Sequence, residues 1–182
     1  MEFFQYLAPT KVIFGRGTEA RTGALCKEAG ATKVLIHYGG HSAKKSGLID
    51  IICASLKAEG ISYTELGGVV PNPRLSKVYE GIELGRKEKI DFILAVGGGS
   101  VIDSAKAIAV MAANPGDLWD YIASGSGKGQ PIKNNPLPIV AISTKAGTGS
   151  EADAGCVITN PETNEKVGLK TPDLFPVLCI ED

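Results

Sequence analysis

Three consecutive glycines and a serine, Gly97 to Ser100, join an apolar run at 92–96 to a helical pattern at 100–113. In a parallel sheet, ligands bind beyond the carboxyl ends of the strands, where helix N-termini direct their free N–H groups outward. Glycines have no Cβ, so their backbone amides can come close to phosphate oxygens. The spacing therefore predicts a seat for the phosphates of a ligand. The alternative is a tight turn closed by a capping box, in which Ser100 and Asp103 form the S-x-x-D pattern.

A second loop rich in glycine and hydroxyl groups follows the apolar run 137–143. It reads STKAGTGSE and contains Thr144 and Thr148. Hydroxyl groups and backbone amides at such an edge suit a pyrophosphate, a ribose or a carboxamide. Because both loops follow strands of one expected sheet, they are predicted to face the same crevice.

Three other motifs are weaker. The segment GRGTEA at Gly15 matches G-x-G-x-x-A, but the strand that follows ends in Tyr38-Gly39-Gly40 rather than in the acid of a Rossmann fingerprint. The segment GSGKGQ at Gly125 lacks the P-loop spacing. The segment AGTGSE around Ser150 is not G-x-S-x-G, which disfavours a serine hydrolase.

The composition excludes several classes of partner. The 19 basic and 20 acidic residues give a net charge of −1, which leaves no electrostatic footprint for nucleic acid or anionic lipid. No apolar run reaches the roughly 18 residues of a membrane span, and the N-terminus lacks the order of a signal peptide, so a cytoplasmic location is expected. The four cysteines are expected to be core thiols, and two histidines, His37 and His41, are too few for a three-histidine metal site.

Apolar β-branched runs alternate with amphipathic stretches. We expect strands at 34–38, 62–66, 92–96, 137–143 and 177–180, and helices at 18–29, 47–59, 75–88 and 100–113. This alternation predicts an α/β fold with a doubly wound, mostly parallel sheet, in a single domain over 1–182. An edge hairpin is expected at 3–15 and a second hairpin at 156–169. The polar stretch at 116–135 is expected to be a surface excursion or a loop over a site.

Six segments in order resemble the N-terminal domain of the iron-containing, or group III, NAD(P)-dependent alcohol dehydrogenases, and are most similar to their butanol dehydrogenase-like branch. They cover nearly the whole chain and read PTKVIFGRG, VLIHYGGHSAKKSG, GVVPNPRLSKVYEG, AVGGGSVIDSAKAIA, NPGDLWDY and STKAGTGSEAD. The resemblance implies a dehydroquinate synthase-like, Rossmann-like nucleotide domain, which in the family precedes a helical domain that holds iron or zinc. It also implies the following cofactor contacts: Gly98, Gly99 and Ser100, with Gly97, at the pyrophosphate; Asn72 beside the adenosine; Asp103, Thr144 and Thr148 at the nicotinamide; and Lys166 at the ribose.

The loop after the second strand bears on the choice of cofactor. In the resembling branch, Tyr-Gly-Gly-x-Ser replaces the acid that marks NAD users, and here Gly39, Gly40 and Ser42 occupy these positions. A carboxylate at position 39 would repel a 2′-phosphate, whereas this loop can accept one, with Lys44 or Lys45 supplying charge. We therefore expect NADP(H) to be favoured over NAD(H).

The resemblance also sets limits. The family's metal ligands, one Asp and three His, come from helices beyond residue 182, so no metal ligand and no catalytic residue is assigned. Lys145 stands where the family usually has threonine or a small residue, and Asp153 stands where threonine or asparagine is common. Both departures alter the expected nicotinamide pocket. We expect a chain that binds dinucleotide but turns over little or no alcohol or aldehyde alone, and that self-associates, as the family does through its hairpin. The alternative is a stand-alone nucleotide-binding or assembly module without catalysis.

Overall fold

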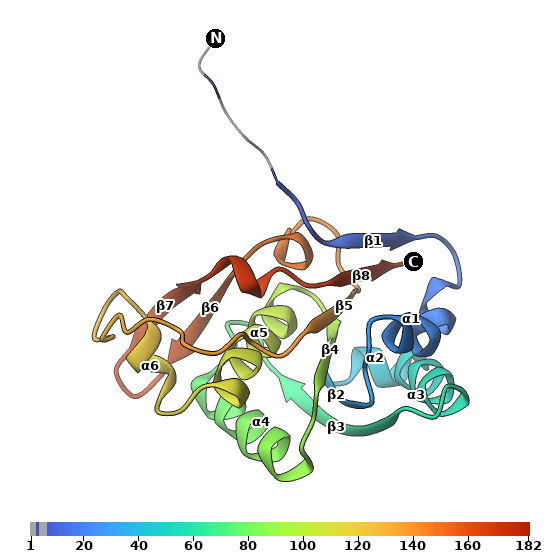
Figure 1. The fold of residues 1–182 in the computed structure, drawn as a ribbon, viewed down its shortest axis with the longest axis horizontal. Helices are drawn as coiled ribbons and strands as arrows, with labels where there is room; N and C mark the ends of the chain where they lie inside the picture. The colour runs from blue at the N-terminus through green and yellow to red at the C-terminus, as the bar shows by residue number, and fades with distance from the viewer. Residues whose placement is uncertain (1–2, 4–6) are drawn as a thin grey trace.

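A six-stranded parallel sheet forms the centre of the molecule (Figure 1). The computed structural model describes residue 3 and residues 7–182. The strands are β1 (Lys11–Phe14), β2 (Lys33–Gly39), β3 (Ser62–Val69), β4 (Phe92–Gly97), β5 (Ile139–Ser143) and β8 (Leu178–Glu181). Their spatial order is β1-β8-β5-β4-β2-β3, and every neighbouring pair runs parallel. The predicted parallel α/β sheet is therefore confirmed.

Helices cover both faces of the sheet, because each buried strand is apolar on both sides. On β2, Val34 and Ile36 join one core cluster while Leu35 joins the other, as the two-residue period of a strand requires. The helical side chains of the first cluster come from α1 (Thr22–Glu28), α2 (Ser42–Lys45) and α3 (Leu48–Ala58). The second comes mainly from α4 (Leu75–Glu88) and α5 (Gly99–Ala113). The doubly wound prediction is confirmed, and α4 has its predicted bounds.

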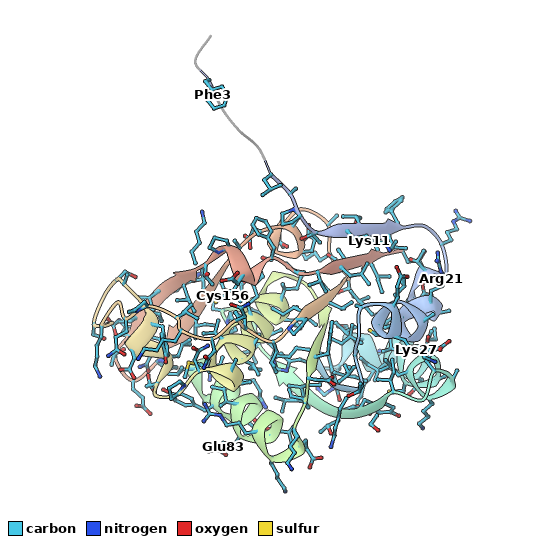
Figure 2. All side chains as sticks on the ribbon, viewed as in Figure 1. Phe3, Lys11, Arg21, Lys27, Glu83 and Cys156 are labelled. Atoms are coloured by element: carbon cyan, nitrogen blue, oxygen red, sulfur yellow. The ribbon has the colours of Figure 1, made fainter. Side chains whose placement is uncertain are left out.

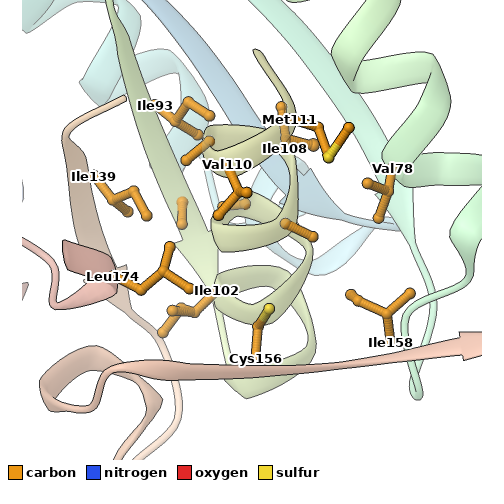
Figure 3. Packing of buried hydrophobic residues seen from close by; sticks show 14 of the residues in the cluster. Val78, Ile93, Ile102, Ile108, Val110, Met111, Ile139, Cys156, Ile158 and Leu174 are labelled. Atoms are coloured by element: carbon orange, nitrogen blue, oxygen red, sulfur yellow. The ribbon is translucent and has the colours of Figure 1, made fainter. Parts of the chain in front are cut away.

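The second predicted hairpin is also confirmed. Strands β6 (Gly155–Asn160) and β7 (Glu165–Lys170) pair antiparallel as a separate two-stranded sheet. Figure 3 shows Cys156 of β6 directed toward α5 and Ile158 directed toward Val78 of α4. Both belong to the same core cluster as Ile102 and Ile108, so the hairpin packs against α5. The hairpin thereby lies close to the first turns of α5.

The polar stretch at 116–135 contains the short helix α6 (Leu118–Tyr121) and is tied to the hairpin by Glu165. This carboxylate accepts hydrogen bonds from the Ser126 amide and hydroxyl, both at 2.6 Å, from the Trp119 indole at 3.1 Å and from the Thr163 hydroxyl at 2.8 Å. These donors, Ser126 first, lower the pKa of Glu165 to about 2. The excursion is therefore anchored at its glycine-rich turn.

Two predicted elements differ in the structure. The expected helix at 18–29 is divided into a 3-10 turn, η1 (Thr18–Arg21), and α1, because the Gly23 amide donates to the Ser55 hydroxyl at 2.8 Å rather than continuing one helical ladder. The expected edge hairpin at 3–15 contributes β1, which pairs parallel with β8 at the edge of the sheet. The first half of that hairpin includes residues 4–6, which lie outside the described residues.

The cysteine side chains lie in the interior and the charged side chains labelled in Figure 2 lie at the surface. All four cysteines are free and buried, as expected. Figure 2 shows Cys156 in the interior, whereas Lys11, Arg21, Lys27 and Glu83 lie around the outside. Among the described helices, none is both long enough and apolar enough to cross a bilayer.

Candidate functional site

A cavity of about 600 Å³ opens at the carboxyl edge of β2 and β4, beside the start of α5. Its walls come from the loop after β2, the turn after β3, the glycine turn, the loop after β5 and the β6–β7 hairpin. Ten of the twelve residues predicted from the sequence line it: Gly39, Gly40, Ser42, Asn72, Gly98, Gly99, Ser100, Asp103, Thr148 and Lys166.

The other two predicted residues lie outside this cavity. Gly97 is buried at the end of β4, and its carbonyl accepts a hydrogen bond from the Thr144 amide at 3.1 Å. Thr144 lines a different hollow, together with Glu19 and Ser46. The hydroxyl of the STKAGTGSE loop that reaches the cavity is therefore Thr148, four residues further on.

The glycine turn serves both packing and access. A methyl group at Gly97 would lie 2.6 Å from Cγ2 of Val101, so this glycine lets α5 pack closely on β4. A methyl group at Gly99 would lie 3.1 Å from the Ser150 hydroxyl oxygen, which is also tight. Gly98 has room: its nearest neighbour would be Cβ of Lys145 at 3.5 Å, an ordinary van der Waals distance. Packing thus requires glycine at position 97 and leaves little room at position 99, whereas Gly98 leaves the cavity wall bare.

Helix α5 begins without a side-chain cap. Gly98 is the N-cap residue in an extended conformation, and no side chain bonds to the first turn. The capping box considered for Ser100 and Asp103 is not formed, because the Asp103 carboxylate accepts from the Val157 amide of β6 at 3.1 Å instead. Within the part of the chain that the structure describes, the amides of Gly99 and Ser100 reach no protein acceptor. They are free to bind an anion.

The cations near the β2 loop are arranged differently from the sequence prediction. Lys44 pairs with Glu65 at 3.1 Å and lies over the Tyr38 ring, 5.3 Å from its centroid. Neither Lys44 nor Lys45 lines the cavity, whereas Lys145 and Lys166 do. The positive charge available to a bound phosphate therefore comes from the loop after β5 and from β7.

Asn72 and Lys166 join two walls of the cavity. Asn72 lies between two prolines in the left-handed region, with φ 55°, which asparagine tolerates better than most residues. Its side-chain oxygen accepts a hydrogen bond of 2.8 Å from the Lys166 ammonium on β7. The Thr159 amide also donates to the Pro73 carbonyl at 2.9 Å. The turn after β3 and the hairpin are thereby held together across the cavity.

Asp103 lies inside the cavity on the first turns of α5. Burial raises the pKa of this carboxyl group, while the hydrogen bond from the Val157 amide opposes the rise. Thr148 lies beside Gly99, and its hydroxyl is 3.3 Å from a carboxylate oxygen of Glu151. Both side chains present hydrogen-bonding groups to the same region of the cavity.

Sequence reasoning missed two buried polar side chains near the site. His37 of β2 is fully buried, with Nδ1 2.9 Å from the Leu66 carbonyl oxygen and Nε2 2.8 Å from the Ser104 hydroxyl, and burial lowers its pKa to about 4. Lys106 of α5 is also fully buried. A lysine within the otherwise apolar run 105–113 of α5 was a visible indication that its ammonium has internal partners. Among residues 3 and 7–182, no group of three or more His, Cys, Asp or Glu side chains is placed to hold a metal ion.

The doubly wound parallel sheet, with a cavity at its carboxyl edge beside an uncapped helix, defines an α/β domain of the type that binds ligands at that edge. Comparison with known sequences identifies its family. The chain belongs to the iron-containing alcohol dehydrogenases, because the family model matches residues 9–182.

Relatives and solved structures agree with this assignment. The chain is 47% identical over 182 residues to a probable NADH-dependent butanol dehydrogenase of Bacillus subtilis, covering all of this chain and 46% of the relative. It is 36% identical over 184 residues to an NADPH-dependent aldehyde reductase of Escherichia coli, again covering 46% of that protein. A crystal structure of an NADH-dependent butanol dehydrogenase from Thermotoga maritima superposes with a TM-score of 0.93 at 46% identity, over all of this chain and 44% of the other. The chain thus spans less than half the length of these relatives.

Proposed function

We propose that residues 1–182 form one domain, the nucleotide-binding half of a metal-containing, NAD(P)-dependent alcohol dehydrogenase, and that the cavity beside α5 binds NADP(H). The observation that carries this proposal is the meeting of ten predicted residues in one cavity, where free amides of Gly99 and Ser100 adjoin the bare wall at Gly98. A diphosphate carries charge that such amides bind well.

Three groups of lining residues would hold the cofactor. The start of α5 would hold its pyrophosphate, Gly39, Gly40 and Ser42 would receive its 2′-phosphorylated ribose, and Asp103 and Thr148 would bind its nicotinamide. When bound, the nicotinamide supplies or accepts the hydride of an alcohol–aldehyde conversion. The chain's own residues bind the cofactor, orient its ring by hydrogen bonds and keep the diphosphate in place.

The preference for NADPH follows from the loop after β2. Gly39 and Gly40 offer no carboxylate to a ribose diol, and Ser42 offers a hydroxyl to a phosphate. The names of the relatives include both cofactors. Four butanol dehydrogenases at 42–48% identity are named NADH-dependent, and the aldehyde reductase at 36% identity is named NADPH-dependent. The loop chemistry is therefore the support for this part of the proposal.

The described residues do not fit the family's metal. Of the two histidines, His37 is enclosed between β3 and α5, and His41 stands alone at the start of α2. We therefore propose that the chain alone binds dinucleotide with little or no turnover, and that a helical polypeptide bearing the metal ligands completes the enzyme for alcohol or aldehyde substrates. A stand-alone nucleotide-binding module is the second candidate.

Calorimetric titration with NADPH and NADH tests the binding proposal. Tighter binding of NADPH is expected, and equal or reversed affinities would discard the preference. A second assay measures NADPH-dependent butanal reduction by the chain alone and after addition of a helical polypeptide with one Asp and three His ligands. Turnover only in the mixture supports a dehydrogenase half, whereas binding without restored turnover favours the stand-alone module.

We also propose that the chain forms homo-oligomers through its edge strand. On β1, Val12 is 52% exposed and Phe14 is 78% exposed. Among the described residues, β1 pairs on one side only, with β8. An edge strand with exposed apolar side chains readily pairs with a second copy.

A further inference from the structure

Lys106 is a fully buried lysine that serves the loop between β5 and β6. Its ammonium lies 2.8 Å from the Ser150 carbonyl, 2.9 Å from the Asp153 carbonyl and 2.9 Å from the Gly155 carbonyl. It also forms an ion pair of 2.5 Å with the Asp153 carboxylate. Four oxygens thus surround the three N–H donors of one ammonium.

These oxygens come from both ends of one segment. Ser150 opens the short 3-10 turn η2 (Ser150–Ala152), and Gly155 is the first residue of β6. Lys106 therefore bridges the exit of the STKAGTGSE loop and the entrance to the hairpin. A buried ammonium is costly unless it is paired and hydrogen-bonded, so the segment and the lysine stabilise each other.

The same segment forms a wall of the cavity. The Ser150 hydroxyl and Thr148 lie against Gly99, where an added methyl group would approach them to 3.1 and 3.2 Å. One helical turn before Lys106, the Asp103 carboxylate accepts from the Val157 amide of β6. Helix α5 thus holds this part of the chain at two successive turns. Lys106 donates to the segment 148–155, and Asp103 accepts from Val157 just beyond it.

We propose that Lys106 is a positioning residue for the dinucleotide: it holds the segment 148–155 so that Thr148 faces the nicotinamide half of the cofactor, beside Asp103 of α5. This inference rests on the proposed function. A lysine with a purely structural role would stabilise the fold without favouring one half of the ligand. The two roles therefore differ in how removal of the ammonium affects the two ends of NADPH.

The test uses Lys106→Met, which keeps an unbranched apolar stem and removes the donor. Affinities for NADPH and for 2′,5′-ADP, which carries only the adenosine end, are measured by calorimetry well below the unfolding midpoint. We expect NADPH to bind about tenfold more weakly, because displacing Thr148 removes a hydrogen bond to the nicotinamide half, an effect of roughly this size. The affinity for 2′,5′-ADP should change by less than about twofold, because this ligand does not reach Thr148. Leu56→Ala is the control, since Leu56 is fully buried in the other core cluster. It is expected to lower stability while leaving both affinities within about twofold.

Asp153→Ala is a second variant that keeps the lysine and removes its half-exposed counter-charge. It should weaken the binding of NADPH several-fold and leave the binding of 2′,5′-ADP nearly unchanged. This variant replaces Lys106→Met in the test if Lys106→Met does not fold. Equal losses for both ligands, or unchanged NADPH affinity in the folded variants, would overturn the proposal. Hydrogen exchange of residues 148–155 gives an independent readout: faster exchange in the variants is expected, and unchanged exchange refutes the positioning role. If the unaltered chain binds neither ligand, the proposed function fails, and hydrogen exchange still decides whether Lys106 orders the segment.

Discussion

Replacing Gly39 by aspartate should reverse the cofactor preference. A methyl group at this position would lie 3.7 Å from the Val69 carbonyl oxygen and 3.9 Å from Cγ2 of Val101, both ordinary contact distances. The backbone at Gly39 is part of β2 and does not have the positive φ that only glycine favours. The substitution therefore adds a carboxylate to the cavity wall with little steric cost, and its main effect is electrostatic.

The magnitude follows from the position of this residue at the cavity mouth. Two unit charges about 4 Å apart interact by about 1 kcal/mol in water and about 4 kcal/mol at an effective dielectric constant near 20. Gly39 is half-buried, so an intermediate repulsion of about 2–3 kcal/mol is expected against a 2′-phosphate. This corresponds to a roughly 30- to 150-fold loss of NADPH affinity. NADH should bind equally well or more tightly, because the carboxylate can accept a hydrogen bond from the ribose hydroxyl.

Calorimetric titration of NADPH and NADH into three proteins checks this expectation. Gly39→Asn is the matched control, since asparagine has nearly the same shape as aspartate without its charge. We expect the asparagine variant to retain most of the NADPH affinity. The electrostatic reasoning is refuted if the aspartate and asparagine variants lose NADPH affinity to the same extent, or if the NADPH-to-NADH ratio of the aspartate variant equals that of the unaltered chain.

Three further outcomes are expected. Because burial lowers the pKa of His37 from 6.5 to about 4, its contribution to the free energy of unfolding is complete above pH 6.5 and is lost as the pH falls toward 4. At 1.36 kcal/mol per pKa unit, His37→Gln should remove about 3 kcal/mol from the change in the free energy of unfolding over this pH range, as measured by urea unfolding. If this free energy depended on pH as in the unaltered chain, the lowered pKa of His37 would be contradicted. Lys145→Thr should weaken NADPH binding several-fold and make it less sensitive to salt, because Lys145 lines the cavity beside Gly98; an unaltered salt dependence would count against a phosphate contact. Phe14→Lys should lower the oligomer mass measured by light scattering, and an unchanged mass would exclude β1 from the interface.

Much of the fold could be predicted, because strands buried on both faces of a parallel sheet read as continuous apolar runs. The run that became β4 is buried along its whole length, and α4 was bounded correctly by its periodicity. The helix α2 was missed, since it covers only Ser42–Lys45 and is too short to show a period. The division of 18–29 was also missed, because it depends on Ser55, which is remote in sequence.

The candidate site was predictable where its groups belong to the backbone. In the glycine turn and the β2 loop, glycines leave the backbone amides exposed, and glycines can be read directly from a sequence. Charged side chains were less predictable, because their partners come from other elements. Lys44 is directed to Glu65 of β3, and the charge near the expected phosphates comes from Lys145 and Lys166 instead. Thr144 and Thr148 could not be told apart, because the path of the loop decides which one reaches the cavity.

The position of β8 has a consequence for how the chain is made. This strand is the last of the described strands to leave the ribosome, yet it lies in the sheet between β1 and β5 and is paired with both. Strand β1 therefore cannot pair with this neighbour until residues 178–181 have been synthesised. Strand pairings so distant in sequence form slowly and leave nascent chains prone to aggregation. During synthesis, chaperones should therefore bind mainly to the segment that contains β1.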